Sequence, residues 1–303
     1  MAVSDSLFAL VETSATYEPL AEGLERVVTD EYVVWIGGVD HPVYSVAQRF
    51  RLEPERVAPA VDEIRALFRA RGRSVATYEL GPSSRPLDLE HRLRALGLRT
   101  YDDDPVTAGM VLTAAPLGDR AEATARRVQS LDEYLTAIDI STRVFGLNDD
   151  QRADKRVGAA ERFADEQAGA PFATFLAFVD GEAIASAKMM LTDRGAILSS
   201  GATLPHARGR GAYRALVAAR WEEAQRRGLG ALVVQAGPMS RPILERLGFV
   251  QVCEVRVCST NSGRPPACRR SSSCARKRQV APRATSTSPA RRPCSARARR
   301  RRT

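Results

Sequence analysis

The chain has 303 residues, of which 44% are hydrophobic and 27% are charged. This length predicts about two domains, and the composition excludes collagen-like, fibrous and wholly disordered chains. No run approaches the ~20 apolar residues that a membrane helix needs. The first residues, Met-Ala-Val-Ser-Asp, contain no basic segment ahead of an apolar run, so we expect no signal peptide, no membrane partner and a cytoplasmic protein.

The net charge of +9 is unevenly distributed along the chain. Residues 259–303 hold thirteen Arg and Lys277 and no acidic residue, a charge of +14, which leaves 9 minus 14, or −5, for residues 1–258. This segment has no Leu, Ile, Met or aromatic residue, so it cannot bury enough apolar surface to fold. We expect a disordered Arg-rich tail. Its composition also resembles GC-rich DNA read out of frame, so it is either a frameshift product or a genuine basic tail.

Helical and strand patterns alternate along the chain. The first part is expected to contain, in order, a helix over 6–28, strands over 31–38 and 44–52, a helix over 54–71 and a strand over 74–80. The second part is expected to contain a strand near 124–128, helices near 131–143 and 150–168, and strands over 171–180, 182–191 and 196–204. Asp180-Gly181 predicts a tight hairpin turn between two of these strands. The mixture indicates an α/β or α+β fold.

One internal repeat relates the two parts. Residues 71–86, RGRSVATYELGPSSRP, align without a gap with residues 227–242, RGLGALVVQAGPMSRP, at an offset of 156. Each copy follows a helix-like stretch and precedes a short run ending in Leu-Gly-Leu or Leu-Gly-Phe. We infer a duplicated fold with lobes at 1–118 and 119–258.

The repeat also carries turn signals. Gly72 and Gly228 are expected to end helices, because glycine adopts the left-handed conformation of a helix C-cap. Pro86 and Pro242 fit the first turn of a helix, where a missing N–H is tolerated. The Ser-Arg-Pro element is therefore expected to be a turn and helix cap, and the alternative is that Arg241 contacts an acceptor.

The most informative segment runs from Gly201 to Leu216, GATLPHARGRGAYRAL. A predicted strand ends near 204, a loop with Gly209 and Gly211 follows, and a predicted helix then continues to about residue 227. Free backbone N–H groups and the helix dipole make such a helix N-terminus an anion site. The alternative is an ordinary tight turn with solvated arginines, since neither a Walker loop nor G-x-G-x-x-G is present.

The run Arg208-Gly-Arg-Gly211-Ala-Tyr213 after a strand resembles the acyl-CoA pyrophosphate loop of the GNAT superfamily of N-acetyltransferases, [QR]-x-x-G-x-[GA]. The strands at 171–204 and the stretches ALVVQAG and ILERLGF resemble other elements of that family, so the resemblance covers about residues 120–258. It implies two tandem GNAT-like lobes, each a mixed, mostly antiparallel sheet flanked by helices. The first lobe resembles a degenerate half, because Glu53-Pro-Glu-Arg stands where a pyrophosphate would lie. We expect it to complete the acceptor pocket or supply an interface.

The resemblance also implies a reaction and a set of contacts. Acetyl-CoA would be the co-substrate, no metal would be needed, and an amine of a small molecule or peptide would attack the thioester directly. The implied cofactor contacts are Gly201, Ala202 and Thr203 for the pantetheine arm, and Arg208, Gly209, Arg210, Gly211, Ala212 and Tyr213 for the pyrophosphate.

The sequence departs from the family's pattern at two positions that concern catalysis. Tyr213 stands where the family has Gly or Ala, and Leu244 stands where it often has a tyrosine general acid. Tyr213 is then either a substitute catalytic acid or a residue packed against the sheet or adenine. Candidates for proton removal are a water chain through Ser199 or Ser200, and His206.

Two other classes of function stay as alternatives. One is a protein that binds CoA without catalysis, and the other is a protein that binds nucleic acid through the tail, which the acidic body disfavours. The five cysteines form no C-x-x-C pair and no His follows His206, which argues against a zinc site. The sequence does not indicate an oligomeric state.

Overall fold

The computed structural model describes residues 3–21, 23–102, 104–118 and 122–260, so the tail expected over 259–303 lies outside the described residues from residue 261 on. Its expected start is wrong by two residues, because Ser259 ends the last strand and the N–H of Thr260 donates to the carbonyl oxygen of Ala76 at 3.0 Å. Twelve strands of the described residues form a single sheet. Among the helices in these ranges, none has the length and apolar character required to span a membrane.

The sheet joins both parts of the chain. Its spatial order is β1 (Glu25–Val28), β2 (Val33–Ile36), β3 (Ser45–Gln48), β4 (Thr77–Leu80), β12 (Val250–Ser259), β6 (Val106–Leu112), β11 (Leu232–Ala236), β10 (Ala196–Thr203), β9 (Glu182–Leu191), β8 (Phe172–Val179) and β7 (Thr124–Arg127), while β5 (Arg99–Thr100) pairs with β12. The α-helices are α1 (Asp5–Glu12), α2 (Val57–Ala70), α3 (Leu89–Ala95), α4 (Leu131–Val144), α5 (Asp149–Arg156), α6 (Ala159–Ala168), α7 (Ala212–Arg226) and α8 (Arg241–Arg246).

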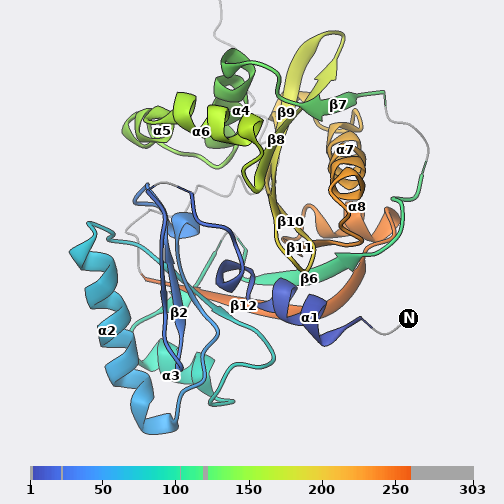
Figure 1. Ribbon diagram of the computed structural model, residues 1–303. Helices are drawn as coiled ribbons and strands as arrows, with labels where there is room; N and C mark the ends of the chain where they lie inside the picture. Colours follow the sequence, from blue (N-terminus) through green and yellow to red (C-terminus); the bar gives the residue numbers. More distant parts are fainter. Residues whose placement is uncertain (1–2, 22, 103, 119–121, 261–303) are drawn as a thin grey trace, which may run out of the picture. The chain divides into compact units, whose positions relative to one another are not determined.

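Different helices cover the two faces of the second half of the sheet, which runs from β6 through β11, β10, β9 and β8 to β7 (Figure 1). On one face, α7 and α8 pack through Leu216, Val217 and Leu244 onto the largest apolar cluster. On the other face lie α4 and α1, the latter against β6, β11 and β12. Because side chains alternate along a strand, each strand contributes to both layers. Helices α2 and α3 cover the strands of the first part.

The repeat in the sequence corresponds to a repeat in the fold. An offset of 156 residues carries α2 onto α7 and β4 onto β11. In each part the helix connects two parallel neighbours, β3 with β4 and β10 with β11. The last strands of the two parts are exchanged, since β12 lies between β4 and β6, and β6 lies between β12 and β11. The tandem architecture expected from the sequence is therefore confirmed.

Two expected helices are wrong in extent. The predicted helix over 6–28 ends at Glu12, and the chain then forms a 3-10 turn and strand β1. Pro19 alone would have stopped a helix near residue 18, because it lacks an N–H and disfavours helical geometry at the preceding residue, but α1 already ends six residues earlier. The predicted helix over 150–168 is divided into α5 and α6 by Gly158, which has a φ of 65°.

The expected turns are largely confirmed. Asp180 and Gly181 form the hairpin turn between β8 and β9, with φ values of 51° and 81°. Gly72 and Gly228 have φ values of 68° and 74° just beyond α2 and α7, as expected of helix ends.

The two prolines of the repeat differ. Pro242 lies in the first turn of α8, as predicted. The prediction for Pro86 is wrong. This residue precedes α3 by three positions, and its carbonyl accepts a hydrogen bond of 3.0 Å from the N–H of Leu89. The chain makes one additional turn there before the helix begins.

Candidate active site

Strands β10 and β11 separate after a short parallel contact. Only Ala196–Leu232 and Ile197–Val233 are in register. Further along, β10 has a bulge between Ser199 and Ala202 in its pairing with β9, and Ser200 has a φ of 51°. The edge of β10 that faces β11 is therefore open over residues 198–203, which include Gly201, Ala202 and Thr203.

The segment after β10 presents backbone donors at a helix N-terminus. A 3-10 turn, Pro205–Ala207, leads to Gly209 and Gly211, which have φ values of 84° and 79° and so adopt a conformation that favours glycine. Within the described residues, no hydrogen bond uses the backbone N–H groups of residues 208–213. These groups and the dipole of the 15-residue helix α7 form a suitable cradle for an anion.

The two arginines of this loop differ in their surroundings. The Arg210 guanidinium Nη2 pairs with Glu122 Oε1 at 2.7 Å and with Asp180 Oδ2 at 3.0 Å. Its charge is therefore largely compensated, and its expected role depends on its backbone N–H. Arg208 is exposed.

Tyr213 joins the two predicted cofactor-binding stretches. A Cβ atom added to Gly201 would lie 2.8 Å from Tyr213 Cε2, so the ring packs directly on the glycine. The Tyr213 hydroxyl interacts with the Arg220 guanidinium, whose pKa is lowered by burial, and the tyrosine opposes that shift. Arg220 is 1% exposed and donates to the carbonyl oxygens of Leu216 (3.0 Å) and Lys188 (3.3 Å). This geometry supports the packing alternative, and a catalytic role for Tyr213 stays a prediction.

The other predicted residues lie in different surroundings. Ser199 and Ser200 are half-buried on β10, His206 is exposed, and Leu244 belongs to the apolar core. Arg241 pairs with Glu245 at 2.8 Å.

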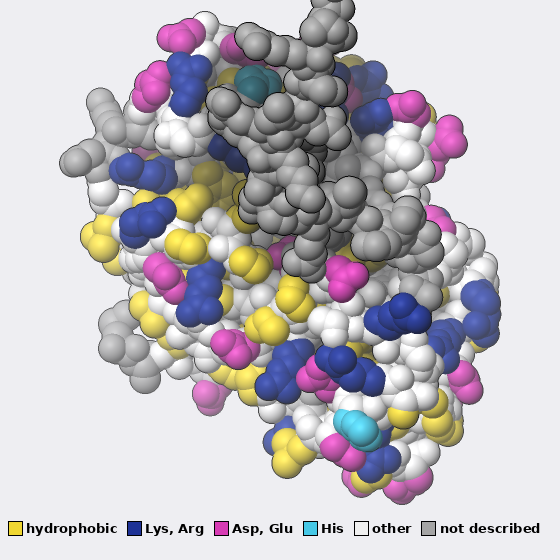
Figure 2. Space-filling model, turned by 180° about the vertical axis from the view of Figure 1, so that it is seen from behind, with side chains coloured by type: hydrophobic (Ala, Val, Ile, Leu, Met, Phe, Trp, Pro, Cys, Tyr) yellow, Lys and Arg dark blue, Asp and Glu magenta, His cyan; other side chains and the backbone are white. Residues whose placement is uncertain are grey.

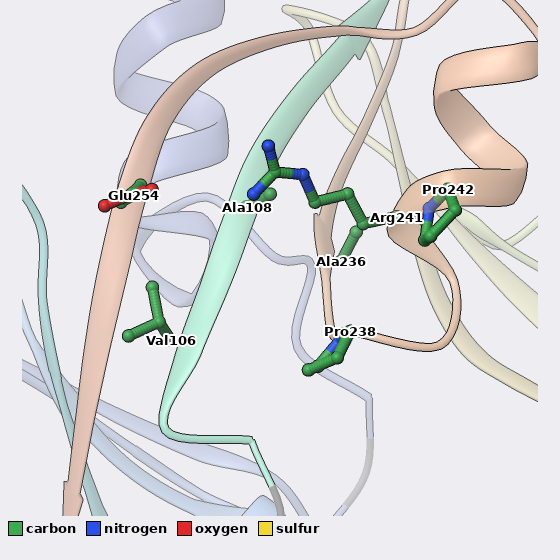
Figure 3. Close-up of a pocket in the computed structure, with 7 residues that line it drawn as sticks. All are labelled: Val106, Ala108, Ala236, Pro238, Arg241, Pro242 and Glu254. Carbon is green, nitrogen blue, oxygen red and sulfur yellow. The ribbon is translucent and has the colours of Figure 1, made fainter.

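Arg241 also lines a surface pocket at β6, β12 and α8 (Figure 3). The cavity has a volume of about 480 Å³, and its lining residues are Val106, Ala108, Ala236, Pro238, Arg241, Pro242 and Glu254. Ala236 belongs to the core cluster under α7 and α8, so this pocket lies on the face opposite α1. Gln235, which precedes Ala236 on β11, faces α1 instead, because neighbouring residues of a strand point to opposite faces.

Two carboxylates near β11 escaped the sequence analysis. Gln235 Nε2 donates to the carbonyl oxygens of Val11 (3.1 Å) and Glu12 (3.3 Å) under the end of α1. Glu79 of β4 approaches the Gln235 amide, and Glu18 lies close to Glu79.

Both carboxyl groups hold protons more tightly than usual. Burial, with the nearby charge of Glu18, raises the pKa of Glu79 to about 7, while the Gln235 amide opposes the rise. Burial raises the pKa of Glu18 to about 7, opposed by Ser14 and Arg26. The only signal in the sequence was that Glu79 aligns with Gln235 in the repeat.

No family model matches the sequence, and no curated protein matches it. Solved structures do match. A GCN5-related N-acetyltransferase from Kribbella flavida is 20% identical with a TM-score of 0.64, over 86% of this chain and 98% of that chain. One from Sphaerobacter thermophilus is 18% identical with a TM-score of 0.53, over 84% and 90%. A tandem GNAT protein from the clavulanic acid biosynthesis pathway is 15% identical with a TM-score of 0.50, over 84% and 93%. The chain therefore has the tandem GNAT-like fold that its sequence predicted.

Proposed function

We propose that the protein transfers an acyl group, acetyl in the first instance, from acyl-CoA to an amine. The observation that carries the proposal is the open edge of β10 immediately before a helix N-terminus whose first N–H groups make no hydrogen bond within the part of the chain that the structure describes. A pyrophosphate would accept hydrogen bonds from residues 208–213, and a pantetheine amide would pair with residues 201–203. The N-acetyltransferases among the similar folds support this assignment.

The open strand edge also suits the chemistry. The acyl carbonyl would lie beside the gap between β10 and β11, where a backbone N–H polarises it. The amine nitrogen attacks the carbonyl carbon, the C–N bond forms, the C–S bond breaks, and the CoA thiolate leaves and takes a proton.

An amine whose pKa is ~10 is protonated near neutral pH, so its ammonium form must lose a proton before the nitrogen attacks. Glu79 is our candidate base, because its raised pKa places its titration near neutral pH and it lies beside Gln235 on β11. Glu18 is its close partner. We propose that the first lobe thus supplies part of the acceptor pocket of the second, with the lobes at 1–118 and 119–258.

Titration of the full chain with acetyl-CoA, followed by thiol release with a panel of amines, tests this proposal. Saturable binding together with amine-dependent thiol release is the expected result. Binding without release for any amine supports the non-catalytic alternative, and no binding at millimolar acetyl-CoA contradicts both.

The nucleic-acid alternative receives less support. On the face in Figure 2, Lys and Arg side chains alternate with Asp and Glu, and the described residues there form no continuous basic stripe. Nucleic-acid affinity that falls steeply with salt would favour it.

A further inference from the structure

Two lysines stand out in a chain whose cations are almost all arginines. The sequence has three lysines, and two of them, Lys155 on α5 and Lys188 on β9, precede the tail. The ammonium group of each of these two lysines lies over the ring of a tyrosine. Lys155 Nζ is 3.8 Å from the centre of the Tyr44 ring, and Lys188 Nζ is 5.2 Å from the centre of the Tyr134 ring and 3.4 Å from its hydroxyl oxygen.

These lysines are close to each other and lack counter-ions. Burial, together with the charges of Lys188 and Arg162, lowers the pKa of Lys155 to about 7. Among the described residues, every ion pair within 4.0 Å uses an arginine, and neither lysine has a carboxylate partner. Half-buried cations without a counter-ion are costly, and an anionic ligand relieves that cost.

A buried hydroxyl lies near Lys188 on the same strand. Ser186 is 2% exposed, and its Oγ has no hydrogen-bond partner among the described residues. It is two residues from Lys188 on β9, so both side chains are on the same face of the sheet. Buried polar atoms normally have a partner, and an unpartnered hydroxyl on the same strand face as Lys188 points to a ligand.

The position of Lys188 links these groups to the candidate active site. Lys188 is opposite Ser199 in the pairing of β9 with β10. Ile197 is opposite Val233, and two residues further along these strands stand Ser199 and Gln235, on the same face. Lys188, Ser199 and Gln235 thus form a row across the sheet at the point where β10 and β11 separate. The lysines lie at one end of this row. Glu79, which approaches Gln235, lies at the other end.

We propose that Lys155 and Lys188 bind an anionic group of the amine acceptor, a carboxylate or a phosphate, so that the acceptor is a small amine bearing a negative charge. This inference rests on the proposed acyl transfer. The anionic group would lie against Lys155, Lys188 and Ser186, and the amine would lie toward Gln235 and Glu79. The acyl-transfer step is the one described above, and the anionic group of the acceptor serves only to orient its amine.

Matched pairs of acceptors test the proposal. Glycine is compared with glycinamide, and O-phosphoethanolamine with ethanolamine, in acetyl-CoA-dependent thiol release by the full chain. We expect kcat/KM to be at least about tenfold higher for the anionic member of one or both pairs, because charge-assisted hydrogen bonds form only with it. The preferred pair identifies carboxylate or phosphate. Equal kcat/KM within both pairs overturns the proposal.

Variants assign any preference to the lysines. Lys188→Met and Lys155→Met should each remove most of this preference, mainly through a higher KM for the anionic amine. Lys188→Arg should restore part of it. Arg99→Met, a change of an exposed arginine on β5, is the matched control and should leave the preference intact. A preference that survives both methionine variants contradicts the assignment.

Direct binding separates failure of this inference from failure of the proposed function. With the lysines carbon-13-methylated, NMR titration with inorganic phosphate and with acetate should shift the Lys155 and Lys188 signals saturably, while Lys277 serves as reference. Saturable shifts without turnover of any amine would support the anion site and refute acyl transfer. Absence of shifts with both anions would refute the anion site, whatever the turnover.

Discussion

Glu79 on β4 and Gln235 on β11 occupy equivalent positions in the two copies of the repeat, 156 residues apart, and their side chains approach each other where the two parts of the sheet meet. The same position of the repeated strand thus occurs twice at this junction. One copy presents a carboxyl group and the other an amide. In the proposed site, the first part of the chain would thus supply a titratable group where the second part has an amide.

Replacing Glu79 with Gln should lower kcat/KM about 10²–10⁴-fold if Glu79 is the base. Because burial raises its pKa to about 7, the ratio of wild-type to variant kcat/KM should rise with pH through about 7 and then level off. The ratio cancels the titration of the acceptor amine. A ratio that stays constant from pH 5.5 to 9 contradicts this role.

Glu18→Gln provides the companion test. Removing the like charge should lower the pKa of Glu79, so the rise in kcat/KM should move to lower pH with a smaller loss of rate. A loss as large as that of Glu79→Gln, with no movement of the profile, would assign the base to Glu18 instead.

The pKa of Glu79 also predicts how stability depends on pH. In the folded protein the Glu79 carboxyl group has a pKa of about 7, whereas in the unfolded chain its pKa is the usual 4.5. The folded protein therefore keeps this proton up to a higher pH than the unfolded chain does. The resulting stabilisation is fully present below pH 4.5 and is lost as pH rises through about 7. Relative to Glu79→Gln, the wild type should therefore lose free energy of unfolding between pH 4.5 and 7. Denaturant unfolding at several pH values measures this, with Glu254→Gln as the exposed control.

Tyr213→Phe distinguishes packing from acid catalysis. The ring should still pack on Gly201, and the Arg220 guanidinium should lose its neighbouring hydroxyl. We expect a loss of about 1–3 kcal/mol in the free energy of unfolding, the cost of a buried unsatisfied group, with kcat within about threefold. A kcat at least a hundredfold lower, with unchanged acetyl-CoA affinity, would instead establish Tyr213 as the acid.

Glu12 connects α1 to the turn of the first repeat copy. It is 4% exposed, and its Oε1 accepts hydrogen bonds of 2.6 Å from both the N–H and the hydroxyl of Ser83. Glu12→Ala should lower the free energy of unfolding by about 1–3 kcal/mol, because the Ser83 groups lose their partner. Glu222→Ala, at an exposed position on α7, should have little effect. Equal effects of the two substitutions in urea unfolding would contradict this connection.

Local patterns predicted much of the second part of the chain. Asp180-Gly181 specified its hairpin, and Gly211 marked the start of α7, because these residues determine backbone conformation within a few positions. The repeat predicted the duplicated fold. The helix expected over 6–28 was too long, because the prediction followed the apolar spacing past Pro19.

The acceptor side required the tertiary structure. Glu79, Gln235 and Lys188 come from strands far apart in sequence, and their proximity depends on the exchange of β6 and β12 and on strand register. A shifted pKa depends on burial, which the spacing of charged residues does not reveal. That the two lysines have no carboxylate partner among the described residues is likewise a property of packing.

The central claim, that acyl-CoA binds at the start of α7, is tested most directly by calorimetric titration of acetyl-CoA into Gly209→Ala and Gly228→Ala. Both glycines have positive φ values, 84° and 74°, and a Cβ at either meets no atom within 4 Å. The two substitutions should therefore cost similar stability. We predict that Gly209→Ala weakens acetyl-CoA binding at least about tenfold, because its Cβ lies where a phosphate approaches the backbone, and that Gly228→Ala binds as the wild type does. Equal affinities in the two variants would contradict the account.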